Sequence, residues 1–133
     1  MSGLLRSKGF MWLASSPSSA FYWSHAGSHF ETQLVGRWWA TVDEAVIPDW
    51  QRDAIMADFQ GDDGDRRQEI VFIGTGLGGD GEDEARNRAT ITAALDWCLL
   101  TDGEMKYYRS VQDDAVACAE AFPNPLQVRL ASM

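Results

Sequence analysis

Three short segments rich in aromatic and aliphatic residues follow one another near the start of the chain, and they constrain the fold most strongly. They are Gly9–Ala14, Ala20–Ala26 and His29–Leu34. Ser15–Ser18, which contains a proline, separates the first two, and Gly27-Ser28 separates the second from the third. Serine, proline and glycine favour tight turns, so each segment reads as a short strand. Neighbouring strands joined by such short turns favour antiparallel pairing.

The rest of the chain alternates between helical and extended patterns. Apolar residues near helical spacing predict a first helix within Asp49–Gln60, and a polar loop separates it from a buried strand at Gln68–Gly74. The glycine-rich, acidic segment Thr75–Glu84 predicts a loop, and Asn87 is the expected N-cap of a second helix. One stripe of that helix comprises Ile91, Ala94, Leu95, Cys98 and Leu99. Thr101–Glu104 either ends this helix or begins another turn.

These elements predict an α+β fold. We expect a small, mostly antiparallel sheet of about four strands, in the sequence order βββαβα, with two helices packed on one face. A chain of 133 residues is long enough for one globular domain.

Charge and cysteine content exclude several classes of partner and site. The formal net charge is −9, which repels nucleic acid and anionic lipid, so neither is an expected partner. Two cysteines provide no disulfide framework, and we expect a cytoplasmic protein. The first 30 residues contain eight serines, Arg6, Lys8 and no acidic residue, as organellar import segments do. Their aromatic density favours strands of the fold, and organellar import stays an open alternative.

No nucleotide-binding or catalytic motif is supported. Gly74–Gly79 fits G-x-G-x-x-G, but the four carboxylates at Asp80, Glu82, Asp83 and Glu84 would repel a pyrophosphate. The two lysines lie outside any G-x-x-x-x-G-K-[ST] frame, so we expect no GTPase activity from this chain. We therefore expect neither catalytic nor cofactor-binding residues.

A metal site is a weaker alternative. His25 and His29, four residues apart across a turn, together with Cys98 or Cys118, offer ligands that zinc accepts. No third ligand has a fixed spacing to the histidine pair. An autonomous zinc-binding protein is therefore the alternative to an interaction domain.

Several charged and aromatic residues are candidates for partner contacts. The segment Asp65–Glu69 places two arginines between carboxylates, which suits either a structural ion-pair network or a docking site. Adjacent tryptophans in an extended segment point in opposite directions, so one ring could face a partner. The candidates are Arg6, Lys8, Trp38, Trp39, Arg66, Arg67, Gln68 and Glu69.

Six segments, taken in order, resemble one known family. They are Gly3–Ala14, Trp23–Gly27 (Trp-Ser-x-Ala-Gly), Gly36–Ala40, Gly64–Gly74, Ala94–Asp102 and Glu104-Met105. The resemblance is to the CobW C-terminal domain, the accessory domain of CobW-type metallochaperone GTPases. It assigns residues 3–105 to that domain and leaves 106–133 as a tail of undetermined structure. The tail lacks the Pro-Phe-Pro-like ending that the family pattern leads us to expect.

The resemblance implies a non-catalytic accessory and interaction domain. Family members deliver zinc or cobalt to client enzymes, and their GTP, magnesium and transition metal are bound mainly by an N-terminal domain that this chain lacks. The implied partners are a CobW-type GTPase domain, in the same polypeptide or a separate one, and a metalloenzyme client. The family's metal-binding cysteines belong to that N-terminal domain, so no metal ligand is carried over to Cys98.

Overall fold

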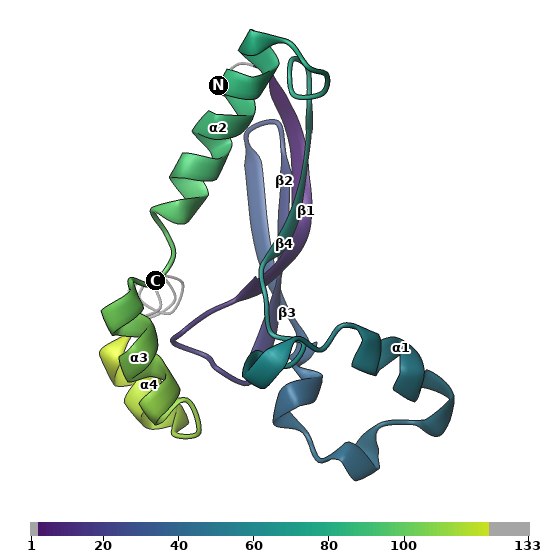
Figure 1. Cartoon of the computed structure of the whole chain (residues 1–133), viewed down its shortest axis with the longest axis vertical. Helices are drawn as coiled ribbons and strands as arrows, with labels where there is room; N and C mark the ends of the chain where they lie inside the picture. Colours follow the sequence, from purple (N-terminus) through teal and green to yellow (C-terminus); the bar gives the residue numbers. More distant parts are fainter. Residues whose placement is uncertain (1–2, 123–133) are drawn as a thin grey trace.

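The structure is a computed structural model that describes residues 3–122. Its sheet contains β1 (Leu4–Trp12), β2 (Ser19–Ala26), β3 (His29–Arg37) and β4 (Glu69–Gly74). The strands lie in the order β3-β2-β1-β4, and each neighbouring pair is antiparallel (Figure 1). The predicted α+β class and antiparallel sheet of about four strands are confirmed. Residues 123–133 of the predicted tail lie outside the described range.

Four helices accompany the sheet. They are α1 (Arg52–Ala57), α2 (Glu82–Asp96), α3 (Asp102–Val111) and α4 (Ala115–Ala121). In Figure 1, α2, α3 and α4 lie on one side of the sheet, and α1 belongs to a lobe that projects on the other side of its lower end. Short 3-10 turns at Trp39–Thr41, Glu44–Val46, Asp49–Gln51 and Gly61–Asp63 complete this lobe. None of the described helices has the length and apolar character needed to cross a bilayer.

The boundaries of the helices differ from the predicted ones for local electrostatic reasons. Helix α2 begins at Glu82, and not near Asn87, because three acidic residues in its first turn interact favourably with the positive end of the helix dipole. The Asn87 side chain instead donates a hydrogen bond to the Gly76 carbonyl. Helix α3 begins with a capping box, in which Thr101 and Glu104 each accept a hydrogen bond from the other's backbone N–H. The Thr101–Glu104 segment therefore starts a new helix.

Strand β1 is longer than predicted, and it lies at the centre of the sheet. It begins at Leu4, because Arg6 pairs with Ala26 on one side and with Ile73 on the other. Gly9 permits the close approach of β4, since a side chain there would collide with the Glu69 carbonyl oxygen. The sequence pattern did not predict residues 4–8 as part of the strand, because this segment contains polar residues.

The two faces of the sheet differ in chemistry and in burial. On one face the Trp23 indole donates a hydrogen bond to the buried Ser7 hydroxyl, and its ring packs edge-on against Phe30 and Phe72. At the paired positions of that face the single charged residue is Arg37, which pairs with Ser19 at the end of β3. On the opposite face, Arg6 and Lys8 of β1 are exposed. Buried apolar residues are few among the described residues: Ala20, Trp38, Ile47, Tyr108 and Cys118.

Candidate interaction surface

The segment from Gly64 to Glu69 is held by contacts within the chain. Gly64 has a φ of +65°, and an added Cβ would lie 2.5 Å from the Cβ of Ala40, so only glycine fits there. Asp65 is 6% exposed, and its two carboxylate oxygens accept hydrogen bonds from the backbone N–H groups of Trp39 (3.0 Å) and Ala40 (2.9 Å). The aspartate thus fixes the start of the lobe against the entrance of β4.

Arg66 links this segment to the C-terminal helices. Its guanidinium donates to the Asp63 carbonyl (2.8 Å) and to the Gln112 side chain (3.2 Å), and it lies 5.6 Å from the centre of the Trp12 ring. Trp12 in turn donates its indole N–H to the Tyr108 hydroxyl at 2.9 Å. The sheet, the 64–69 segment and α3 are therefore joined through one set of contacts.

Arg67 and Gln68 are also engaged within the chain. Arg67 pairs with Glu69 at 2.9 Å, lies 3.8 Å from Asp58 and donates to the Asp65 carbonyl at 2.9 Å. The Gln68 side chain accepts the backbone N–H of Trp12 at 2.6 Å. These contacts are the structural network that the sequence allowed as one of two interpretations. A role for Arg66, Arg67, Gln68 and Glu69 as partner contacts stays a prediction.

The tryptophans divide into buried and exposed rings. Trp38 is 6% exposed, and its indole nitrogen finds no hydrogen-bond partner among residues 3–122, whereas Trp39 is half-buried. The most exposed rings are Trp50, at 82%, and Trp97, at 90%, and sequence reasoning singled out neither as a contact. Trp97 does not belong to the predicted apolar stripe of the second helix, and this position could have indicated from the sequence that its ring is exposed. Trp50 is one of the apolar residues at helical spacing that predicted the first helix, and that spacing does not reveal its exposure.

Exposed apolar and basic side chains meet on the outer part of the sheet. Arg6, Lys8 and Phe10 of β1 point to the same face as Val71 and Ile73 of β4, since Lys8 pairs with Val71 and Arg6 with Ile73. Phe10, Val71 and Ile73 are 41%, 54% and 49% exposed. We call these five residues the β1–β4 patch. It combines two of the predicted contact residues with three apolar side chains that the chain leaves open.

The structure does not bring the metal-ligand candidates together. The His25 ring contacts the Ser7 hydroxyl and the Gly27 carbonyl, and His29 lies 3.7 Å from Glu31. Cys98 is exposed on the segment after α2, whereas Cys118 is buried in α4. Within residues 3–122, no group of three or more His, Cys, Asp or Glu side chains is placed to hold a metal ion.

Burial changes the chemistry of two groups near the α3–α4 contact. Desolvation raises the pKa of the Cys118 thiol, and the nearby carboxylates of Asp114 and Asp113 raise it further. Desolvation also raises the pKa of the Tyr108 hydroxyl, against smaller opposing effects from Trp12 and Arg66. Both groups therefore stay protonated at neutral pH, and Cys118 is a poor metal ligand because zinc binds the thiolate.

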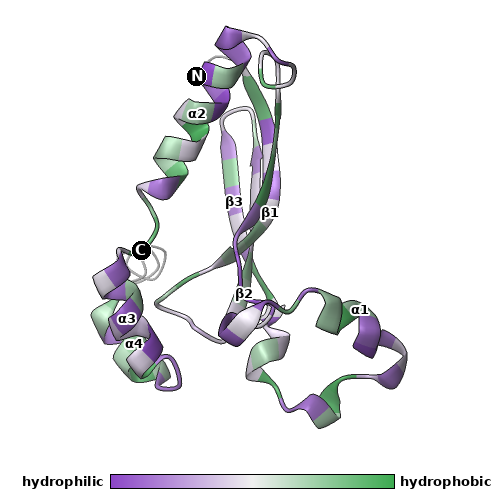
Figure 2. Cartoon of the chain, viewed as in Figure 1, coloured by the Kyte–Doolittle hydropathy of each residue, from purple (hydrophilic) through white to green (hydrophobic). Residues whose placement is uncertain are grey.

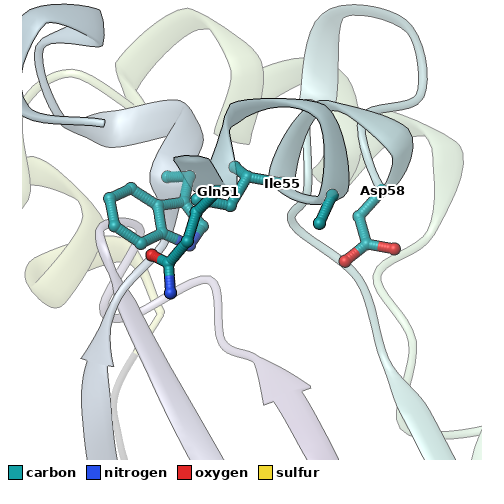
Figure 3. Close-up of a pocket in the computed structure, with 5 residues that line it drawn as sticks. Gln51, Ile55 and Asp58 are labelled. Atoms are coloured by element: carbon teal, nitrogen blue, oxygen red, sulfur yellow. The ribbon is translucent and has the colours of Figure 1, made fainter. Parts of the chain in front are cut away.

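A shallow pocket lies on the lobe, beside α1 (Figure 3). Its volume is about 310 Å³, and Trp39, Gln51, Ala54, Ile55 and Asp58 line it. Trp39 and Ile55 contribute apolar surface to its lining. Figure 3 shows the Asp58 carboxylate at the opposite end of the pocket from Gln51. The pocket is open to solvent and lies at the small end of the range for ligand sites, so it suits a single side chain better than a metabolite.

Comparison with known proteins assigns the family. The model of the cobalamin synthesis protein CobW C-terminal domain matches residues 1–99. The zinc-regulated GTPase metalloprotein activator 1 of Dictyostelium discoideum is 38% identical over 105 residues, which cover 77% of this chain and 20% of that protein. The chain thus spans about one fifth of the length of this relative. A search of solved structures found no match. The family match covers most of the chain, and the chain therefore belongs to the family of CobW C-terminal domains.

Proposed function

We propose that this chain is a non-catalytic accessory domain of a CobW-type, GTP-dependent metal chaperone. In this role it contacts a GTPase domain, in the same polypeptide or a separate one, and a metalloenzyme client that receives zinc or cobalt. The family match carries the proposal, since it covers residues 1–99. The similar protein from Dictyostelium discoideum is named as a GTPase and a metalloprotein activator, and it is about five times longer than the matched region.

The β1–β4 patch is the surface that we assign to the GTPase domain. Its three apolar side chains are exposed, and burying them against a partner is favourable by about 25 cal/mol per Å² of apolar surface. Arg6 and Lys8 bring two positive charges to the patch in a chain whose net charge is −9. Glu69 lies on the same face beside Phe10, but its carboxylate already pairs with Arg67 at 2.9 Å. The patch therefore favours an acidic or neutral partner surface. On the opposite face, the Trp23 indole already donates a hydrogen bond to the Ser7 hydroxyl, so these two side chains are engaged within the chain.

We assign the binding of GTP, magnesium and the transferred metal to the GTPase domain. The 133 residues contain no P-loop sequence, and their described part gathers no metal-ligating cluster. GTP and magnesium therefore bind in the GTPase domain, and zinc or cobalt is cargo that the complete chaperone transfers. The accessory domain contributes binding energy and orientation to that transfer.

Binding to the isolated GTPase domain tests the proposal. The probe is the region of the Dictyostelium discoideum relative outside the matched fifth, titrated calorimetrically with the 133-residue chain. We expect saturable one-to-one binding, weakened about three- to tenfold by Lys8→Glu and to a similar degree by Val71→Thr.

The chain offers matched controls for both changes. Lys106, the only other lysine, lies exposed on α3, and Val116 lies exposed on α4. Lys106→Glu and Val116→Thr repeat the same chemical changes away from the patch, and we expect less than a twofold effect from either. Absence of binding by the wild-type chain would contradict the proposed function. Equal weakening by the control variants would contradict the assignment to the β1–β4 patch.

A further inference from the structure

We propose that the lobe formed by residues 39–63 is a second docking surface, and that it takes a basic, amphipathic segment of a partner protein. This lobe, which we call the acidic lobe, contains the 3-10 turns and α1 and projects away from α2, α3 and α4 (Figure 1). It shares no residue with the β1–β4 patch. The inference therefore stands apart from the proposed GTPase contact.

The acidic lobe presents apolar side chains that the chain does not cover. Trp50 is 82% exposed, and Val46 and Met56 are also exposed. The same lobe contains the pocket of about 310 Å³, which Trp39 and Ile55 help to line. Figure 2 shows hydrophobic and hydrophilic residues side by side along the lobe. Tryptophan side chains are enriched among the residues that contribute most to protein–protein binding.

Charge identifies the chemistry of the occupant. The acidic lobe contains seven carboxylates and a single basic residue, Arg52, so its formal charge is −6 in a chain whose net charge is −9. Arginines from outside the lobe pair with two of the seven carboxylates, Asp58 and Asp63, and the other five still exceed Arg52. An apolar surface surrounded by carboxylates attracts lysine and arginine side chains and repels acidic ones. A second copy of this chain carries the same net charge, which opposes self-association through this surface.

The pocket shows how a basic side chain would be held. Its lining includes one aromatic residue, Trp39, and one carboxylate, Asp58. A guanidinium can stack on an indole and pair with a carboxylate at the same time. The chain's own Arg67 lies only 3.8 Å from Asp58, yet 59% of the Asp58 side chain remains exposed. Asp58 thus already attracts one guanidinium and is open to another.

The experiment uses the full 133-residue chain and a synthetic probe. The probe is a fluorescein-labelled peptide of about 12 residues with arginines on one helical face and leucines on the other, and its twin has glutamate in place of each arginine. We expect fluorescence anisotropy to show saturable binding of the arginine peptide and none of the glutamate peptide. Binding should weaken at least about tenfold when sodium chloride rises from about 0.05 M to about 0.5 M.

Variants locate the binding site. Trp50→Ala should weaken binding about tenfold, and Asp58→Asn about three- to tenfold. The matched controls are Trp97→Ala on the far side of the molecule and Asp113→Asn after α3, and we expect less than a twofold effect from each. None of the four variants should change binding to the GTPase domain.

Three results would overturn the inference. The first is equal binding of the two peptides or the absence of saturable binding at low salt. The second is equal weakening by the control variants, which would mean non-specific attraction to an acidic protein. The third is sedimentation showing a dimer that Trp50→Ala dissociates, which would make a second copy the occupant. Loss of GTPase-domain binding alone would leave the inference standing and contradict only the proposed function.

Discussion

Replacement of Asp65 by alanine should destabilise the fold more than any surface change in the same segment. The carboxylate of Asp65 is 6% exposed and accepts two backbone N–H groups, from Trp39 at 3.0 Å and Ala40 at 2.9 Å. Each hydrogen bond to a charged group contributes about 1.5–3 kcal/mol, and removal leaves both donors without this acceptor. We expect Asp65→Ala to lower the free energy of unfolding by about 3–5 kcal/mol.

Urea unfolding, followed by tryptophan fluorescence and circular dichroism, measures the effect. Asp65→Asn keeps one acceptor oxygen but turns an amide donor towards the second N–H, so it should cost about half as much. The control is Asp62→Ala, an exposed neighbour, which should change the free energy of unfolding by less than about 0.5 kcal/mol. A cost below about 1 kcal/mol for Asp65→Ala would refute the role that we give to this carboxylate.

Three further predictions concern the reactivity of the two cysteines, the pH dependence of stability and the zinc content of the purified protein. In the native protein, a thiol reagent should modify Cys98 quickly and Cys118 only after denaturation, because Cys118 is buried and its pKa is raised; equal rates would contradict this. The free energy of unfolding should fall as pH rises above about 9, because the folded state keeps protons on Cys118 and Tyr108 that the unfolded chain loses. Tyr108→Phe should make this decrease with pH less steep. A free energy of unfolding that rises with pH would contradict the prediction. Zinc should not co-purify in a one-to-one ratio, since the described residues gather no ligand cluster; stoichiometric zinc, measured by mass spectrometry, would favour the autonomous zinc-binding alternative.

Local sequence patterns were sufficient to locate all four strands, although not all of their ends. Strand β2 begins within one residue of the predicted position and ends where expected, because turn residues bound it on both sides. Strand β4 was found from its apolar run and begins only one residue later than predicted. The start of β1 was missed because Arg6 and Lys8 lie on an open face, where pairing with two neighbours, and not burial, keeps the strand extended.

The late helices and the exposed tryptophans were harder to predict. Helix α3 depends on its capping box, a local signal that the sequence contained, and it packs through Tyr108 against Trp12, which is 96 residues away. Such a long-range contact has no periodic signature. The exposure of Trp50 is likewise a property of the lobe as a whole, because helical spacing identifies an apolar face without identifying what covers it.

For Asp65–Glu69, residue type predicted that the charged side chains would pair, but not whether they pair within the chain or with a partner protein. Two arginines between carboxylates indicated dense pairing, and the structure shows that pairing inside the chain. The sequence could not distinguish partners within the chain from partners outside it. The positive φ of Gly64, +65°, is a conformation that glycine adopts readily.

Site-specific photo-cross-linking tests the central claim most directly. A p-benzoylphenylalanine placed at Val71 lies in the middle of the β1–β4 patch, and the same group placed at Val116 lies on α4. In a mixture of the chain with the CobW-type GTPase domain, we expect a cross-linked product from position 71 and none from position 116. A product from position 116 alone, or from neither position although the two proteins bind, would contradict docking of the GTPase domain on the β1–β4 patch.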